Sequence, residues 1–123
     1  MIRVTTDKGN INISSHVYTK IAGIAATNCF GVKGMAFRSM TDGLVHLLRK
    51  EAMSKGVYVT FDEDDAISID LHIVVDHGVN IPALADSIIS EVRYVVGSST
   101  GAQVKAVNVF VDSITIEKWA AGP

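Results

Sequence analysis

Between Ile81 and Val96 the sequence repeats apolar residues at the spacing of one helix face, over four turns. Such a stripe is hidden from water only against another element, so the chain must also supply a sheet or a second helix. Asn80 precedes the stripe as a cap, and Pro82 falls in the first turn, where its missing N–H costs little. We expect Gly97 to end this helix. The stripe consists of Ile81, Leu84, Ala85, Ile88, Ile89, Val92, Val95 and Val96.

Residues 57–61 and 67–75 alternate apolar and polar side chains and predict two strands, joined by an acidic turn at 62–65. The longer strand has one apolar face and one that is at least partly polar. This division is typical of a sheet that helices cover on one side. The apolar face is Ile67, Ile69, Leu71, Ile73 and Val75, and the other is Ser68, Asp70, His72 and Val74.

The last predicted strand changes phase near its end. Valines alternate with other residues over 107–111, but the next apolar pair, Ile114 and Ile116, is displaced by one position. A one-residue slip would send that pair to the opposite face of the sheet. We therefore expect a bulge or a tight turn at Asp112 and Ser113.

The first third of the chain predicts a hairpin and a helix. Isoleucines and a valine alternate around a glycine turn within residues 2–13, and Ser14 or Ser15 then caps a helix that ends near Asn28. Residues 31–37 follow as a loop or a short strand. A narrow leucine stripe predicts one more helix over residues 42–54, lying at the periphery.

These elements predict an α+β fold in a single domain, residues 1–123. Its sheet is small, mixed or antiparallel, with the two main helices on one face and the helix over 42–54 as an additional peripheral one. The length, 123 residues, suffices for one core without metals or disulfides.

The composition argues against several classes of function. Eleven basic residues against thirteen acidic ones give a net charge of −2, whereas nucleic-acid-binding domains usually carry a basic excess. Cys29 is the sole cysteine, so no internal disulfide points to an oxidising compartment. No apolar run approaches the roughly 20 residues that cross a bilayer. We expect a cytoplasmic protein whose membrane link, if it has one, comes through a partner or the surface.

Polar residues do not gather into a recognisable catalytic or metal site. The carboxylates of 62–65 are consecutive, so alternate side chains point apart, and we interpret them as a solvated turn. Asp70 and His72 share a strand face and suggest an acid–base pair, the basis of a remote hydrolase hypothesis. No nucleophile motif accompanies them. We predict no enzymatic activity, no metal and no cofactor.

The segment Gly31-Val32-Lys33-Gly34 has the GxxG spacing of a KH loop, which brings backbone amides close to RNA phosphates. A single-stranded RNA-binding module that uses Gly31, Lys33 and Gly34 is therefore the alternative hypothesis. The negative net charge weakens it, and we do not expect a nucleic-acid partner.

With these residues in view, the chain resembles the alkaline-shock-protein family of envelope stress response proteins of Gram-positive bacteria, in its short single-domain branch. The resemblance covers nearly the whole chain and lies in the order and spacing of its motifs. The motifs are Gly9-x-Ile11-x-Ile13-Ser14, Gly31-Val32-x-Gly34-Met35, Asp42-Gly43-Leu44, Gly56-Val57-x-Val59, His77-Gly78, Thr100-Gly101 and Val107-Asn108-Val109-x-Val111.

The resemblance implies a non-enzymatic scaffold or adaptor in cell-envelope homeostasis, acting by protein–protein contacts and self-association near the inner face of the membrane. It suggests a membrane-anchored family relative or a lipid-metabolism kinase subunit as the partner, and a homo-oligomer. Catalytic residues cannot be transferred, because the family motif defines none.

The sequence predicts two candidate interaction surfaces. One is the exposed side of the peripheral helix, with Arg38, Arg49 and Lys50, and the other is the open sheet face around His72, Asn108 and Phe110. Trp119, the only tryptophan, either packs on its own domain or anchors an interface.

Overall fold

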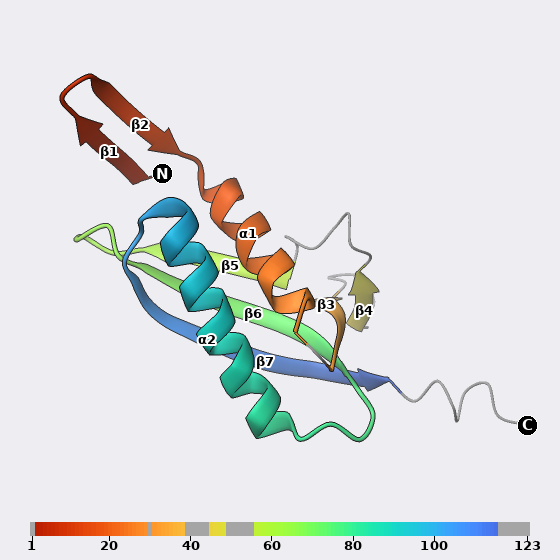
Figure 1. Ribbon diagram of the computed structural model, residues 1–123. Helices are drawn as coiled ribbons and strands as arrows, with labels where there is room; N and C mark the ends of the chain where they lie inside the picture. The colour runs from red at the N-terminus through yellow and green to blue at the C-terminus, as the bar shows by residue number, and fades with distance from the viewer. Residues whose placement is uncertain (1, 30, 39–44, 49–55, 116–123) are drawn as a thin grey trace, which may run out of the picture.

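The computed structural model describes residues 2–29, 31–38, 45–48 and 56–115, with the backbone alone for residues 2, 33–38 and 45–48. Their order along the chain is strand, strand, helix, four strands, helix, strand (Figure 1). The elements are β1 (Ile2–Thr6), β2 (Gly9–Ile13), α1 (Ser15–Thr27), β3 (Val32–Arg38), β4 (Val45–Leu48), β5 (Val57–Phe61), β6 (Ile67–Asp76), α2 (Ile81–Thr100) and β7 (Val104–Thr115).

Strand β6 is the centre of a mixed five-stranded sheet. Along one edge it pairs in parallel with β7, and α2 supplies the crossover that a parallel neighbour requires. Along the other edge it pairs antiparallel with β5 over its first half and with β3 over its second half. Strand β4 continues the sheet beyond β3. Of the two sheet types expected, mixed or antiparallel, the structure has the mixed one.

Both helices lie on the same face of this sheet, so the predicted α+β class is confirmed (Figure 1). The alternate residues of β6 that the sequence assigns to the apolar face are fully buried beneath them. Four residues of the α2 stripe pack into the same core from above, while α1 contributes mainly small side chains that allow close approach. The buried helix residues are Tyr18, Ala22, Ala25, Ala26, Leu84, Ile88, Val92 and Val96.

The helix starts follow the expected chemistry. The Ser14 hydroxyl accepts a hydrogen bond from the His16 N–H at 3.2 Å, and the Asn80 side chain accepts one from the Ala83 N–H at 3.1 Å. Each bond satisfies a backbone donor that has no partner within the helix. These caps fix where the helices begin and therefore how they lie on the sheet.

The predicted end of α2 at Gly97 is wrong. The helix continues to Thr100, and Gly101 ends it in the left-handed conformation with φ +75°. The Gly101 N–H donates to the Gly97 carbonyl at 2.8 Å, and the Thr100 hydroxyl donates to the Val96 carbonyl at 2.7 Å. These bonds offset the helical cost of an internal glycine, about 1 kcal/mol.

The helix predicted over residues 42–54 is also wrong where the structure describes it. Val45–Leu48 forms β4 and pairs antiparallel with β3, with Met35 opposite Leu48 and Arg38 opposite Val45. The leucine spacing suits either element over so short a segment, and strand pairing decided between them. Residues 42–44 and 49–54 lie outside the described residues.

The expected bulge in the last strand is confirmed. Ile73 faces Val111, but the next residue of β6 faces Ser113, so Asp112 is an extra residue in β7. The insertion restores the phase of the strand, and Ile114 returns to the helix side instead of pointing away from it.

Candidate functional site

Three aromatic side chains form a row across the sheet face opposite α1 and α2: Tyr58 on β5, His72 on β6 and Phe110 on β7. The His72 and Phe110 rings are stacked, with centroids 4.7 Å apart and planes 10° apart. The Tyr58 ring meets His72 edge to face, at 5.4 Å and 89°. Tyr58 and Phe110 still leave 55% and 43% of their surface exposed. This aromatic row therefore offers a large, ordered contact area.

A carboxylate fixes the middle ring of the aromatic row. Oδ2 of Asp112, the extra residue of the β7 bulge, lies 2.8 Å from Nδ1 of His72. Both side chains are largely shielded, with 29% of His72 and 21% of Asp112 exposed. Asp112 thus contacts β6 from the bulge, a kind of irregularity that is common near functional sites. The bond fixes the His72 ring, against which the Tyr58 and Phe110 rings pack.

The same face contains a second cross-strand pair. The Asn108 side-chain amide donates to Oδ1 of Asp70 at 2.9 Å, and these two residues are register partners on β7 and β6. Tyr58 lies opposite Asp70 on the other neighbour, β5. Three strands thus contribute to one continuous face.

The acid–base pair suggested by the sequence does not form. Asp70 is bonded to Asn108, and His72 is bonded to Asp112. Within the described residues, no hydroxyl or thiol hydrogen-bonds to His72, whereas nucleophilic catalysis requires such a neighbour.

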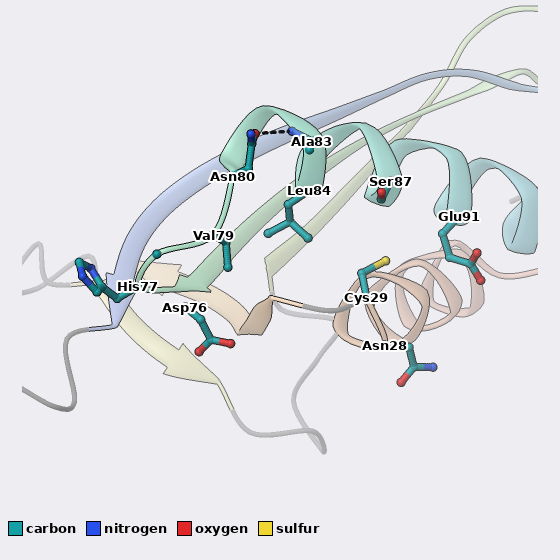
Figure 2. A pocket seen from close by; sticks show the side chains of 11 residues that line it. Asn28, Cys29, Asp76, His77, Val79, Asn80, Ala83, Leu84, Ser87 and Glu91 are labelled. Atoms are coloured by element: carbon teal, nitrogen blue, oxygen red, sulfur yellow. Dashed lines mark hydrogen bonds between the residues drawn. The ribbon is translucent and has the colours of Figure 1, made fainter.

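A groove of about 880 Å³ lies at the other end of the sheet, between the end of α1, the loop after β6 and the start of α2. Its titratable side chains are Cys29, Asp76, His77 and Glu91. Figure 2 shows His77 and Glu91 at opposite ends of the groove, with Cys29 directed toward α2. The hydrogen bonds and ion pairs of the described residues join no two of these four side chains.

The Cys29 thiol is not activated in this groove. Burial raises its pKa, and the negative charge of Glu91 raises it further. Its Sγ atom donates to the Ala25 carbonyl at 3.5 Å. A protonated thiol is a poor nucleophile and a poor metal ligand. Cys29 is partly buried and packs against the hydrophobic core.

The acidic segment at residues 62–65 forms the expected turn. Oδ1 of Asp62 accepts hydrogen bonds from the N–H groups of Asp64 and Ala66, at 2.9 and 3.0 Å. Its other oxygen lies 3.7 Å from the Lys105 ammonium group. In the part of the chain that the structure describes, no three histidines, cysteines or carboxylates are placed to share a metal ion.

The GxxG segment does not have KH geometry. Gly31 occupies a turn after α1 with φ +97°, but Gly34 lies inside β3, where it pairs with Val74. A KH loop joins two helices, whereas this segment joins a helix to a strand. The RNA-loop hypothesis based on Gly31, Lys33 and Gly34 therefore loses its structural support.

The remaining candidates of the sequence separate into two groups. His72, Asn108 and Phe110 lie together on the open face, as expected. Arg38 is the last residue of β3, and its side chain is not among those described. Arg49, Lys50 and Trp119 lie outside the described residues. The surface assigned to Arg38, Arg49 and Lys50 therefore stays a prediction, as do the two roles considered for Trp119.

Two residues of the open face were missed by the sequence reasoning. The sheet face on which Tyr58 lies depends on the register between β5 and β6. The sequence alone does not give this register. Asp112 was noted only as a bulge position. Alternation within β5 gave a signal for Tyr58, because it is the exposed neighbour of the buried Val57.

The chain was also compared with known proteins. Residues 3–116 match the family of alkaline shock protein 23, described by a cell envelope-related function. The chain belongs to this family. The resemblance found in the sequence motifs is thereby confirmed, and a cell envelope-related function follows at the level of the family.

Two relatives illustrate the range of the family. YloU of Bacillus subtilis (strain 168) is 38% identical over 116 residues, covering 94% of this chain and 96% of the relative. A Streptococcus pyogenes protein named stress response regulator gls24 homolog is 33% identical, covering 93% of this chain and 64% of its own length. Among solved structures, a MamM CTD variant aligns with a TM-score of 0.48 and 17% identity, over 81% of this chain and 98% of that one.

Neither helix of the described residues is long and apolar enough to span a membrane.

Proposed function

We propose that this family member is a non-enzymatic adaptor of the cell envelope and that it binds protein partners through its open sheet face. The observation that carries the proposal is the aromatic row Tyr58–His72–Phe110, exposed yet held in place by Asp112. Exposed aromatic residues that are already ordered lose little entropy on binding, and such residues dominate protein interfaces.

The chemistry of the face indicates the kind of partner. Carboxylates of Asp70 and Asp112 flank the aromatic row. A complementary surface would present arginine or lysine, which pair with carboxylates and stack on aromatic rings. We take the partner to be a membrane-anchored relative of the same family or a kinase subunit of lipid metabolism. A cytoplasmic protein held at the inner membrane face by such a partner is the setting that we propose.

In-cell crosslinking tests this function. Cells producing the tagged full chain, its Tyr58→Ser/Phe110→Ser variant or its Tyr94→Ser variant are treated with a short crosslinker, and captured proteins are identified by mass spectrometry. Tyr94 is the matched control, because it is 72% exposed and lies on α2, in the helix layer. Partners captured by the wild type and by the control, but lost from the double variant, support the proposal.

The proposal is wrong if the double variant captures the same partners as the wild type. Circular dichroism of both variants establishes that the folds are equivalent. A second function is not proposed, because the segment with GxxG spacing does not form the loop that RNA binding requires.

A further inference from the structure

The groove between the end of α1 and the start of α2 has one helix face as a wall. The groove residues of α2 and its N-cap are spaced three or four apart and therefore share one side of the helix. They are Asn80, Ala83, Leu84, Ser87 and Glu91. At 1.5 Å per residue this wall is about 16 Å long. An extended chain advances about 3.3 Å per residue, so about five residues of a peptide span the groove.

The middle of the groove is apolar and already packed. Figure 2 shows the side chains of Val79, Leu84 and Cys29 between the two ends. Leu84 is buried, and Val79 and Cys29 pack against the core. Gly31 lies so close beneath that an added Cβ would be 3.1 Å from Val79 and 3.3 Å from Leu84. The apolar surface is therefore held in place before any ligand arrives.

A carboxylate lies toward each end of the groove. Asp76 is the last residue of β6, and Glu91 is about three turns into α2 (Figure 2). Within the described residues neither carboxylate pairs with a lysine or arginine, and Asp76 accepts only a long bond, 3.5 Å, from the Thr115 hydroxyl. The charge of Glu91 raises the pKa of Cys29, so its field reaches the middle of the groove.

The start of α2 does not reverse the sign of this charge. A helix N-terminus attracts anions through its free N–H groups. Here Pro82 has no N–H, and the N–H of Ala83 donates to the Asn80 side chain at 3.1 Å. An anion would therefore find few donors at this helix start and two carboxylates nearby. The groove favours a cation.

We propose that this groove binds an extended segment of about five residues from a partner protein, with a lysine or arginine at each end and an apolar residue between them. Alternate side chains of an extended segment point to the same side, so the first, third and fifth can all face the groove. The two cations then pair with Asp76 and Glu91, and the apolar side chain packs on Leu84.

The groove and the aromatic row are separate sites. The groove is formed by α1, α2 and the loop after β6, on the helix side of the sheet. Tyr58, His72 and Phe110 lie on the opposite face. A single chain can therefore hold one partner at each site, which suits an adaptor. Binding in the groove does not depend on occupancy of the aromatic row.

A peptide titration of the purified full chain, followed by the NMR shifts of its backbone amides, tests the groove. The probe is acetyl-Lys-Ala-Leu-Ala-Lys-amide, and the control peptide has the same residues in the order Lys-Lys-Ala-Ala-Leu. We expect a dissociation constant on the order of 100 μM for the probe and at least about threefold weaker binding of the control. The amides of Cys29, Val79 and Ser87 should shift, and those of Tyr58 and Asn108 should not.

Two variants of equal net charge separate the groove from general electrostatic attraction. Ser87→Lys places an ammonium group inside the groove, where it competes with the cations of the probe. Ser90→Lys adds the same charge to an exposed position of α2 outside the groove. We expect the dissociation constant of the probe to rise at least about tenfold in Ser87→Lys and less than about twofold in Ser90→Lys. Likewise, Glu91→Gln should weaken binding about threefold, and Asp86→Asn, exposed on α2 outside the groove, should not.

Any of four results would overturn the assignment of the groove. They are no binding at millimolar probe, equal binding of the two peptides, equal effects of Ser87→Lys and Ser90→Lys, and amide shifts confined to the open face. The Tyr58→Ser/Phe110→Ser variant should bind the probe as the wild type does. Failure of the groove and failure of partner capture by the aromatic row are therefore distinguishable.

Discussion

Nδ1 of His72 lies 2.8 Å from Oδ2 of Asp112, although 40 residues separate the two in sequence. Asp112 is the extra residue of the β7 bulge, between Val111 and Ser113, which are the register partners of Ile73 and Val74. The contact joins the central strand to its parallel neighbour on the face that the helices leave open. This bond is the anchor of the aromatic row.

The bond can be removed without enlarging any side chain. Asp112→Ala should lower the free energy of unfolding by about 0.5–1.5 kcal/mol, because a largely shielded hydrogen bond is lost. Urea denaturation at neutral pH measures the change. Glu63→Ala, on an exposed turn, removes the same charge and should change stability by less than about 0.5 kcal/mol. Equal losses in the two variants would show that the bond contributes nothing measurable.

The central strand should dominate the stability of the core. Ile69 is fully buried at the middle of β6, so Ile69→Ala should lower the free energy of unfolding by about 2–5 kcal/mol. Ile114→Ala removes the same atoms from a residue that is 42% exposed, and should cost less than about 1.5 kcal/mol. Denaturant midpoints of the two variants give the comparison. A smaller effect for Ile69 would contradict the assignment of the core to the helix side of the sheet.

Gly31 is required at its turn for two reasons that can be separated. Its φ is +97°, and an added Cβ would lie 3.1 Å from Val79 and 3.3 Å from Leu84. Gly31→Ala should therefore destabilise the protein by at least about 1 kcal/mol. Gly78 has a similar φ of +90° with nothing within 4 Å of the added atom, so Gly78→Ala reports the backbone strain alone. Thermal unfolding should show the larger loss for Gly31→Ala, and the reverse order would refute the crowding.

Tyr18 should make the protein less stable in alkaline solution. Burial raises the pKa of its phenol, the nearby Thr100 hydroxyl partly opposes this, and the charge of Asp65 adds to the rise. The unfolded chain releases the phenolic proton first, near pH 10, so folding stability is constant below that pH and falls as pH increases. Unfolding at about pH 8 and about pH 10.5 should show a smaller alkaline loss in Tyr18→Phe than in the wild type.

Tyr94→Phe is the control for this comparison, because Tyr94 is 72% exposed and its removal should leave the alkaline loss as in the wild type. The buried Tyr18 hydroxyl has no hydrogen-bond partner in the described structure. Tyr18→Phe should therefore be neutral or slightly stabilising at about pH 8. If all three proteins lose the same folding stability at alkaline pH, ionisation of Tyr18 is not the cause of the loss.

Long periodic segments were predictable from the sequence. The α2 stripe and the alternation of β6 each repeat often enough to exclude the other period, and even the bulge at Asp112 was visible as a change of phase. The prediction for the segment around Val45–Leu48 failed because four residues are too few to distinguish the helical period from the strand period. There the neighbour, β3, decided the structure.

The open face illustrates the same limit for function. His72, Asn108 and Phe110 were predictable as residues of one face, because alternation fixes which side of its own strand each residue occupies. Their partners were not predictable, since pairing Tyr58 and Asp112 with His72 requires the register between strands. Register depends on backbone hydrogen bonds between distant segments, which no local pattern encodes.

The sequence by itself determined the family, the α+β class and the buried apolar face of β6, because alternation of apolar side chains is a local property of each segment. Only the tertiary structure decided which strands are neighbours and which carboxylate holds His72. Those features arise when segments far apart in the chain are brought together, and their geometry is set by contacts that exist only in the folded state.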